Sequence, residues 1–160
     1  MRIGTTISSV QTPIIPVIGE WTRNTPGTLS LGQGMVSYPP PESVLQEICD
    51  FGLRIEEHLY GSPLGYEPLL KLIATKLLSE NGIDSSSHNR LMVTAGSNMA
   101  FFNVLRTITD PGDEVILPLP YYFNQEMAIR MLNCIPVTVP TDASYQLQLE
   151  GLRSAITEKT

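Results

Sequence analysis

Apolar residues recur at helical spacing in five stretches of the chain. The first predicts a helix over about residues 41–58, although Gly52 lies inside it. The second is expected to begin near Pro68, which suits a first helical turn, and to end at Gly82. The stripes that predict the five helices are Val44, Ile48, Phe51 and Ile55; Leu69, Ile73 and Leu77; Phe101, Leu105 and Ile108; Phe123, Met127 and Met131; and Leu149, Leu152 and Ile156.

Three short apolar runs, at residues 91–94, 114–119 and 135–139, predict buried strands. From residue 90 onward these runs alternate with the predicted helices. Strands joined through crossover helices pair in parallel, with right-handed connections. The second half of the chain is therefore predicted to begin a doubly wound α/β sheet.

Residues 1–28 show few periodic apolar positions and contain several prolines and glycines. They are predicted to form an arm that lies on another surface, rather than a core element. A short extended piece at residues 29–31 and the motif Gly32-Gln33-Gly34 follow. Paired glycines allow a backbone to approach a ligand closely, although a plain tight turn is the commoner reason for such a pair.

The motif Ala95-Gly96-Ser97-Asn98 stands between a predicted strand and a predicted helix. The first N–H groups of a helix lack an intrahelical acceptor, and the helix dipole adds positive charge there, so this corner can bind an anion such as phosphate. Many α/β loops use Gly-Ser as a plain helix cap, so the motif alone does not decide between the two roles. It matches neither the dinucleotide-binding GxGxxG pattern nor the P-loop.

Three aromatic residues follow the strand predicted at 114–119, in the motif Pro120-Tyr121-Tyr122-Phe123. Open α/β sheets bind ligands at the carboxyl ends of their strands. An aromatic ring in that place can stack on a flat heterocycle. Packing in a core or an interface is the alternative, and it is the commoner role for such residues.

The net charge of −6 and the pI of about 4.8 narrow the choice of partners. An acidic chain has no long-range attraction for nucleic acid or anionic lipid. No stretch reaches the roughly 20 apolar residues of a membrane span, and the N-terminus lacks a signal-peptide pattern, so we expect a cytoplasmic protein. Cys49 and Cys134 are expected to be buried thiols, and no metal site is expected because neither histidine lies near them in sequence.

Three stretches, taken in this order, resemble the class I/II aminotransferases, fold-type-I enzymes that use pyridoxal 5'-phosphate (PLP). They read LSLGQGMVSYPPPESV, LYGSPLGYEPLLKLIA and VTAGSNMAFFNVLRTITDPGDEVILPLPYYFN. The resemblance implies an α/β fold, the three-layer α/β/α PLP-binding large domain in incomplete form, preceded by an N-terminal arm and a small-domain helix. It implies domains at residues 1–40, the arm with a substrate-side glycine loop, and 41–160, the start of the large domain.

The same resemblance implies transfer of an amino group between an amino acid and a 2-oxo acid, in a homodimer with shared active sites. Two alternatives stay open at this point. One is a lyase or synthase reaction on the same scaffold, because a fold does not fix a reaction. The other is a non-catalytic remnant that binds a phosphate ligand.

The resemblance also implies roles for individual residues on the cofactor side. Gly96, Ser97 and Asn98 match the turn that binds the PLP phosphate of their own subunit. Tyr122 matches the aromatic residue that stacks on the pyridine ring, and Tyr121 is the neighbour that could take its place.

Two further residues match positions outside that corner. Tyr60 matches a tyrosine that reaches the cofactor phosphate of the partner subunit, and Gly34 matches a glycine near the substrate carboxylate. The family's later motifs, including the lysine that binds the cofactor covalently after Ser-x-Ser, are expected beyond residue 160. We therefore expect no catalytic residue in this chain, because none of its lysines follows Ser-x-Ser: Lys71 and Lys76, which are predicted to face solvent, and Lys159.

Overall fold

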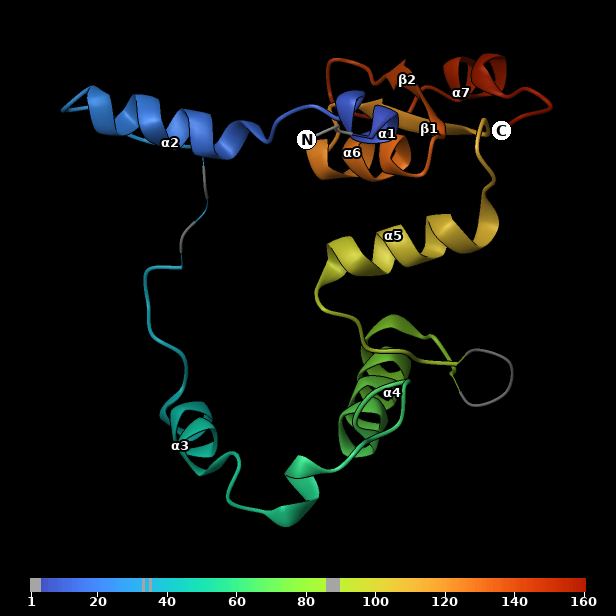
Figure 1. Cartoon of the computed structure of the whole chain (residues 1–160). Helices are drawn as coiled ribbons and strands as arrows, with labels where there is room; N and C mark the ends of the chain where they lie inside the picture. The colour runs from blue at the N-terminus through green and yellow to red at the C-terminus, as the bar shows by residue number, and fades with distance from the viewer. Residues whose placement is uncertain (1–3, 33, 35, 86–89) are drawn as a thin grey trace. The chain divides into compact units, whose positions relative to one another are not determined.

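The computed structural model describes residues 4–32, 34, 36–85 and 90–160. The chain divides into two compact units. Unit 1 comprises residues 1–32 and 95–160, and unit 2 comprises residues 33–94. Figure 1 labels the α-helices and strands of both units.

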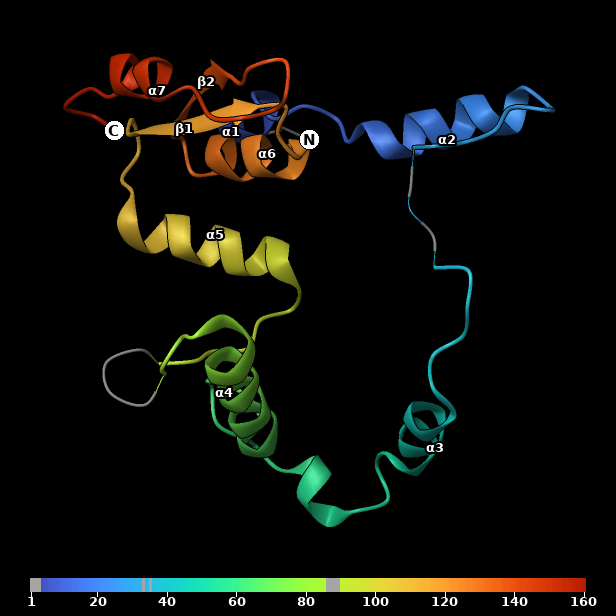
Figure 2. The ribbon, with the colours of Figure 1, turned by 180° about the vertical axis from the view of Figure 1, so that it is seen from behind.

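Unit 1 contains a small three-layer arrangement around two parallel strands. Strand β1 (Glu114–Leu119) pairs with β2 (Ile135–Pro140), with Glu114 opposite Ile135 at one end and Leu119 opposite Pro140 at the other. Helix α6 (Phe123–Met131) connects them, as a parallel pair requires. Helices α6 and α7 (Leu149–Ala155) lie on opposite faces of the sheet (Figures 1 and 2). The predicted strands, helices and α/β class of this region are confirmed.

The core of unit 1 lies between β1, α6 and helix α5 (Ser97–Ile108). Successive side chains of a strand point to opposite faces of the sheet, so each strand can contribute residues to both faces. Leu117 of β1 faces α6, whereas Val139 of β2 lies against Gly151 of α7. The buried cluster consists of Leu105, Leu117, Ala128, Ile129 and Cys134.

Ile129 is the fully buried centre of this cluster. Replacing it with valine removes one methylene group and leaves a small cavity, so we expect a loss of about 0.5–1.5 kcal/mol in the free energy of unfolding. Chemical denaturation monitored by circular dichroism measures this loss. Ile135→Val is the matched control: Ile135 is 46% exposed, and its replacement should change the unfolding free energy much less. Equal losses in the two variants would show that Ile129 is not the centre of the core.

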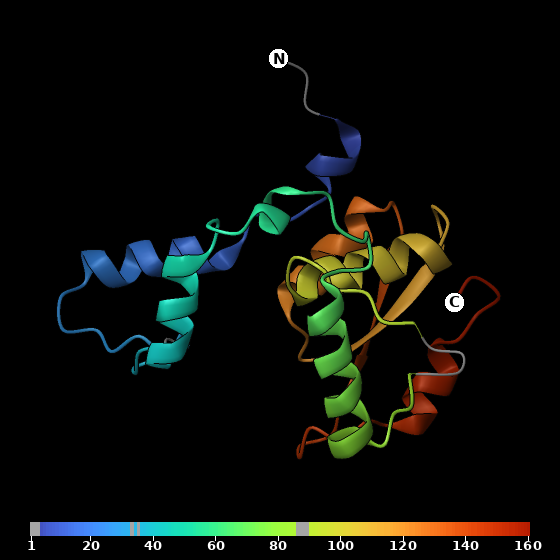
Figure 3. The ribbon, with the colours of Figure 1, turned by 90° about the horizontal axis from the view of Figure 1, so that it is seen from below.

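Unit 2 is built from helix α3 (Glu42–Asp50), the 3-10 helix η1 (Ile55–His58) and helix α4 (Glu67–Asn81). Figure 3 shows α4, in green, from the side. Pro68 lies in its first turn, and Gly82 ends it with φ 67°, in the left-handed region that glycine adopts without strain. Both ends of this helix agree with the sequence-based prediction.

The single helix predicted over residues 41–58 is wrong. Helix α3 ends at Asp50, and the chain resumes helical structure only at η1. Gly52 has φ +89°, which an α-helix cannot contain, so the glycine breaks the helix rather than merely weakening it. The carbonyl of Gly52 lies 2.8 Å from Nε2 of His58, which holds the turn between the two helices.

The strand predicted over residues 91–94 is also wrong. The sheet in the described part of the chain contains only β1 and β2. The N–H of Val93 donates to the carbonyl of Leu64 at 2.8 Å, so the segment is bonded to a loop of unit 2. An apolar run becomes a strand only where a neighbouring strand takes its hydrogen bonds, and β1 does not do so here.

The N-terminal arm contains helices that the sequence analysis did not predict. Helix α1 (Thr5–Ser8) and helix α2 (Ile14–Asn24) are both without buried residues, in agreement with an arm that is not part of the core. The Thr6 hydroxyl donates to Oδ1 of Asn133 at 3.0 Å, which places α1 against the end of α6. The predicted domain boundary between residues 40 and 41 stays a prediction, since the compact units describe contacts only within this chain.

Candidate cofactor site

The amino end of α5 has the geometry of an anion site. Gly96 precedes the helix with φ 83° and ψ 168°, a conformation that is essentially restricted to glycine. The N–H of Ala100 makes the first bond of the helix, to the carbonyl of Gly96 at 3.3 Å. The N–H groups of Ser97, Asn98 and Met99 therefore have no acceptor within the helix. The first turn itself contains no acidic residue that would compete with an anion for these groups.

Tyr122 presents an exposed ring at the start of α6. It occupies the N-cap position of the helix, and 49% of its surface is exposed. Its ring lies against that of Phe123, with centroids 4.9 Å apart and planes inclined by 59°. Its hydroxyl accepts a hydrogen bond from Nδ2 of Asn124 at 2.9 Å. These two contacts restrain the ring and leave much of it open to a ligand.

Tyr121 is in a different environment from its neighbour. Its ring packs against the buried cluster of unit 1. Its hydroxyl donates to Oε2 of Glu126 at 2.5 Å, and this hydrogen bond, with burial and the carboxylate charge, raises the pKa of Tyr121 above its ordinary value of 10.0. The ring and hydroxyl of Tyr121 are therefore occupied within the protein, which favours Tyr122 as the ring available for stacking.

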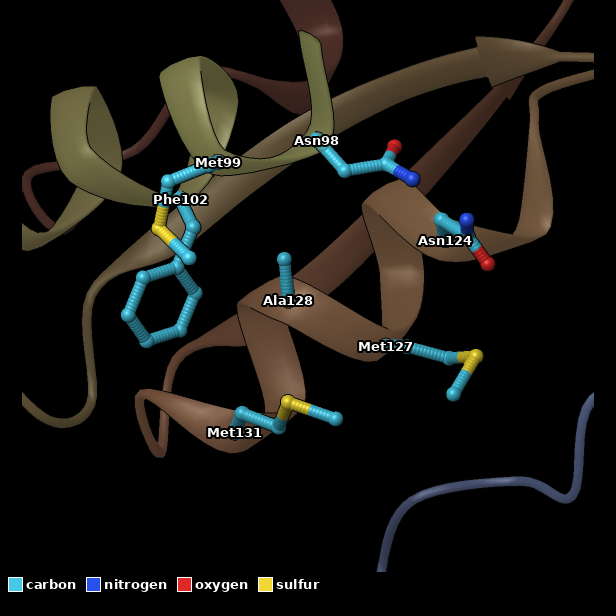
Figure 4. A pocket seen from close by; sticks show the side chains of 7 residues that line it. All are labelled: Asn98, Met99, Phe102, Asn124, Met127, Ala128 and Met131. Carbon is cyan, nitrogen blue, oxygen red and sulfur yellow. The ribbon is translucent and has the colours of Figure 1, made fainter. Parts of the chain in front are cut away.

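One cavity connects the α5 corner with the start of α6. It has a volume of about 420 Å³ and lies between the two helices (Figure 4). The amides of Asn98 and Asn124 come from the first turns of the two helices, and Asn124 also bonds to Tyr122. Asn98 of the predicted phosphate corner and Asn124, the hydrogen-bond partner of the predicted stacking ring, thus line the same cavity. The lining residues are Asn98, Met99, Phe102, Asn124, Met127, Ala128 and Met131.

Asn124 is the residue at this site that the sequence analysis missed. The only signal was an amide two residues after the aromatic pair, and a polar residue in a first helical turn is common enough to pass unnoticed. Its hydrogen bond to Tyr122 depends on the turn that starts α6, which the sequence pattern does not specify.

The two remaining predicted residues, Gly34 and Tyr60, belong to unit 2. Tyr60 is fully exposed and follows η1. Gly34 is exposed as well, and Gln33 of the same motif lies outside the described residues. Their roles toward substrate and partner cofactor stay predictions.

The lysines and cysteines were predicted with mixed success. Lys71 pairs with Glu67 at 2.8 Å and Lys76 pairs with Glu80 at 3.0 Å, all on the exposed surface of α4, so the prediction that both lysines face solvent is confirmed. The prediction for cysteine is right for Cys134, which is buried, and wrong for Cys49, which is exposed because α3 buries none of its residues.

Among the described residues, no group of side chains could hold a metal ion. No helix in that part of the chain is long and apolar enough to cross a membrane.

The family model for aminotransferase class I and II matches residues 26–160. The chain belongs to this family. A probable aspartate/prephenate aminotransferase of Aquifex aeolicus is 34% identical over 134 residues, which cover 82% of this chain and 34% of that protein. An aromatic aminotransferase of Arabidopsis thaliana is 33% identical over 79% of this chain and 32% of its own length.

Solved aminotransferase structures resemble the chain along its whole length. The aspartate aminotransferase of Rhizobium meliloti has a TM-score of 0.85 at 31% identity, and the match covers 100% of this chain and 41% of that one. The chain therefore has the fold of the corresponding part of an aminotransferase. The chain spans about a third of the length of these two curated relatives.

The carboxylate of Glu126 makes the stability of unit 1 depend on pH. The hydrogen bond from Tyr121, and then those from Arg130, lower the pKa of Glu126 below its ordinary value of 4.5, against the opposing effect of burial. A carboxyl group with a lowered pKa stabilises the folded state fully above its unfolded pKa, and this stabilisation is lost as the pH falls through the folded pKa.

We therefore expect wild type to be more stable than Glu126→Gln at neutral pH, with the difference shrinking as the pH falls below about 4.5. Urea denaturation from pH 7 to pH 3 measures the difference in unfolding free energy. Glu150→Gln, in the exposed Glu150–Arg153 pair of α7, should show little difference at any pH. A Glu126→Gln difference that stayed constant with pH would contradict the assigned ionisation.

Proposed function

We propose that the whole protein is a PLP-dependent aminotransferase, which moves an amino group between an amino acid and a 2-oxo acid. The observation that supports the proposal is that Asn98 of the α5 corner and Asn124, which donates to the Tyr122 hydroxyl, line one cavity. PLP has a phosphate at one side of a flat pyridine ring, so it needs an anion site and a stacking surface close together. The family of the chain supports the same cofactor.

The residues present fit that cofactor in two further respects. A Cβ atom built at Gly96 would meet no atom of the described residues within 4 Å, so none of their side chains packs against this glycine. The N–H groups of Ser97 and Asn98 can donate to phosphate oxygens, and the amide of Asn98 adds a neutral donor beside them. Tyr122 would cover one face of the pyridine ring.

When it is bound, PLP supplies the electron sink that lets an amino acid lose its Cα proton. The part of this chain would be to bind and orient: the corner holds the phosphate and the ring of Tyr122 sets the plane of the pyridine. We assign no catalytic residue to the chain, because Lys71 and Lys76 are in surface ion pairs and Lys159 is exposed near the C-terminus.

Substrates, assembly and location are part of the same proposal. The curated relatives act, by their names, on aspartate, prephenate or aromatic amino acids, and we propose an amino acid and a 2-oxo acid as substrates here. We further propose a cytoplasmic homodimer in which Tyr60 reaches the partner's cofactor phosphate and Gly34 lies near the substrate carboxylate. The full exposure of Tyr60 in one chain is compatible with such a role.

Incubation of the whole protein, of which this chain is a part, with PLP, an amino acid and a 2-oxo acid tests the proposal. We expect an absorption band of bound PLP and the appearance of the new amino acid and the new 2-oxo acid in equal amounts. Release of ammonia in the absence of a 2-oxo acid acceptor would indicate a lyase rather than an aminotransferase. Absence of PLP binding would overturn the cofactor assignment itself.

A further inference from the structure

Tyr121, Glu126 and Arg130 form a hydrogen-bonded cluster beside the cofactor site. Oε2 of Glu126 accepts from the Tyr121 hydroxyl at 2.5 Å, and Oε1 accepts from Nε and Nη2 of Arg130 at 2.8 and 2.7 Å. Nε2 of Gln11, from the N-terminal arm, also donates to Oε2 at 3.3 Å. The Glu126 side chain is only 15% exposed, so these donors replace most of its water.

The cluster holds the chain on both sides of Tyr122. Tyr121 precedes it and is fixed by its packing in the core and by its hydroxyl. Glu126 follows it by four residues, in the first turn of the helix that Tyr122 caps. The backbone of Tyr122 is extended, with φ −76° and ψ 120°, and adjacent side chains of an extended chain point to opposite sides. With Tyr121 anchored inward, Tyr122 is directed outward.

We propose that Tyr121, Glu126 and Arg130 are positioning residues that hold the ring of Tyr122 in the orientation that stacks on the cofactor, an inference that rests on the proposed function. None of the three is required to touch the cofactor. Their effect is transmitted through the backbone of residues 121–126. The Tyr121 hydrogen bond to an ionised carboxylate is of the stronger, charge-assisted kind, which suits it to fix a backbone segment.

The first test measures the ring of Tyr122 directly, in the absence of PLP. With 3-fluorotyrosine incorporated at position 122, we expect one dispersed 19F resonance in the otherwise wild-type protein. Tyr121→Phe removes the hydroxyl and keeps the ring, so the resonance should shift toward that of free fluorotyrosine. Glu126→Gln should have a similar effect. Tyr145→Phe is the matched control, because Tyr145 is 72% exposed, and it should leave the resonance unchanged.

The second test measures the dissociation constant of PLP by equilibrium dialysis. We expect it to rise roughly three- to tenfold in Tyr121→Phe and in Glu126→Gln, less than the full loss of one charge-assisted hydrogen bond, because the cluster acts on the cofactor only through the ring of Tyr122. The dissociation constant of the double variant should be no higher than that of the single variant that binds PLP more weakly, because both changes disrupt the same contact. A cluster that served only stability would lower the melting temperature and leave the dissociation constant unchanged.

The two measurements separate this inference from the proposed function. If wild type does not bind PLP, the proposed function fails, and the 19F resonance still shows whether the cluster orients Tyr122. If wild type binds PLP and both the resonance and the dissociation constant are the same in Tyr121→Phe, Glu126→Gln and Tyr145→Phe, the positioning role is overturned.

Discussion

Replacement of Gly96 by valine should weaken PLP binding by roughly a hundredfold, the range of a backbone strain of about 1–3 kcal/mol together with lost phosphate contacts. Gly96 has φ 83° and ψ 168°, which a β-branched residue cannot adopt without strain. The variant must either keep this strain or move the corner away from the geometry that directs the N–H groups of Ser97 and Asn98 outward. Titration with PLP, followed by absorbance, measures the change.

Gly112 provides a matched control for this substitution. It has φ +98°, and a Cβ atom there would also meet nothing within 4 Å. It lies in the turn before β1, where its N–H donates to the carbonyl of Asn133 at 2.9 Å. Gly112→Val should therefore lower stability while leaving the affinity for PLP close to wild type. Similar losses of affinity in both variants would mean that Gly96 acts through general folding and not through the phosphate.

Tyr122→Ala should weaken PLP binding by about 1–2 kcal/mol, or roughly 5- to 30-fold, because it removes the stacking surface. The same change at Tyr145, another exposed tyrosine of unit 1, should have little effect. The melting temperature should change little in either variant, since about half of the Tyr122 surface is exposed. Full affinity in Tyr122→Ala would show that another ring stacks on the pyridine, and Tyr121 would be the next residue to examine.

The elements predicted best were those with a signal at their ends. Helix α4 has Pro68 in its first turn and Gly82 after its last, and helix α5 follows Gly96. Proline fixes φ and glycine permits a positive φ whatever the rest of the chain does, so local sequence is sufficient to place these helix ends. Strands β1 and β2 were predicted correctly because the connecting helix brings them together in parallel.

The errors came from features that depend on more than local pattern. Residues 91–94 had the composition of a strand but no strand beside them to complete it. Helix α2 was missed because residues 1–28 were interpreted as an arm with few periodic apolar positions and several prolines, although Pro16 lies in the first turn of a helix, where proline is tolerated. The stripe of Ile14, Val17, Ile18 and Trp21 was a usable signal for that helix.

The candidate site shows the same limit. Gly96, Ser97 and Asn98 could be proposed from a motif, since the anion-binding property belongs to any uncapped helix start. The choice between Tyr121 and Tyr122 could not, because it depends on which ring packs in the core and which hydroxyl meets Glu126. The contribution of Asn124 likewise follows from the packing of α5 beside α6.

A crystal structure of the protein with PLP tests most directly whether one cofactor molecule joins the α5 corner to Tyr122. We predict phosphate oxygens at about 3 Å from the backbone nitrogens of Ser97 and Asn98, with the Tyr122 ring lying flat on the pyridine. A phosphate bound away from this helix start, or a pyridine ring out of reach of Tyr122, would contradict the account.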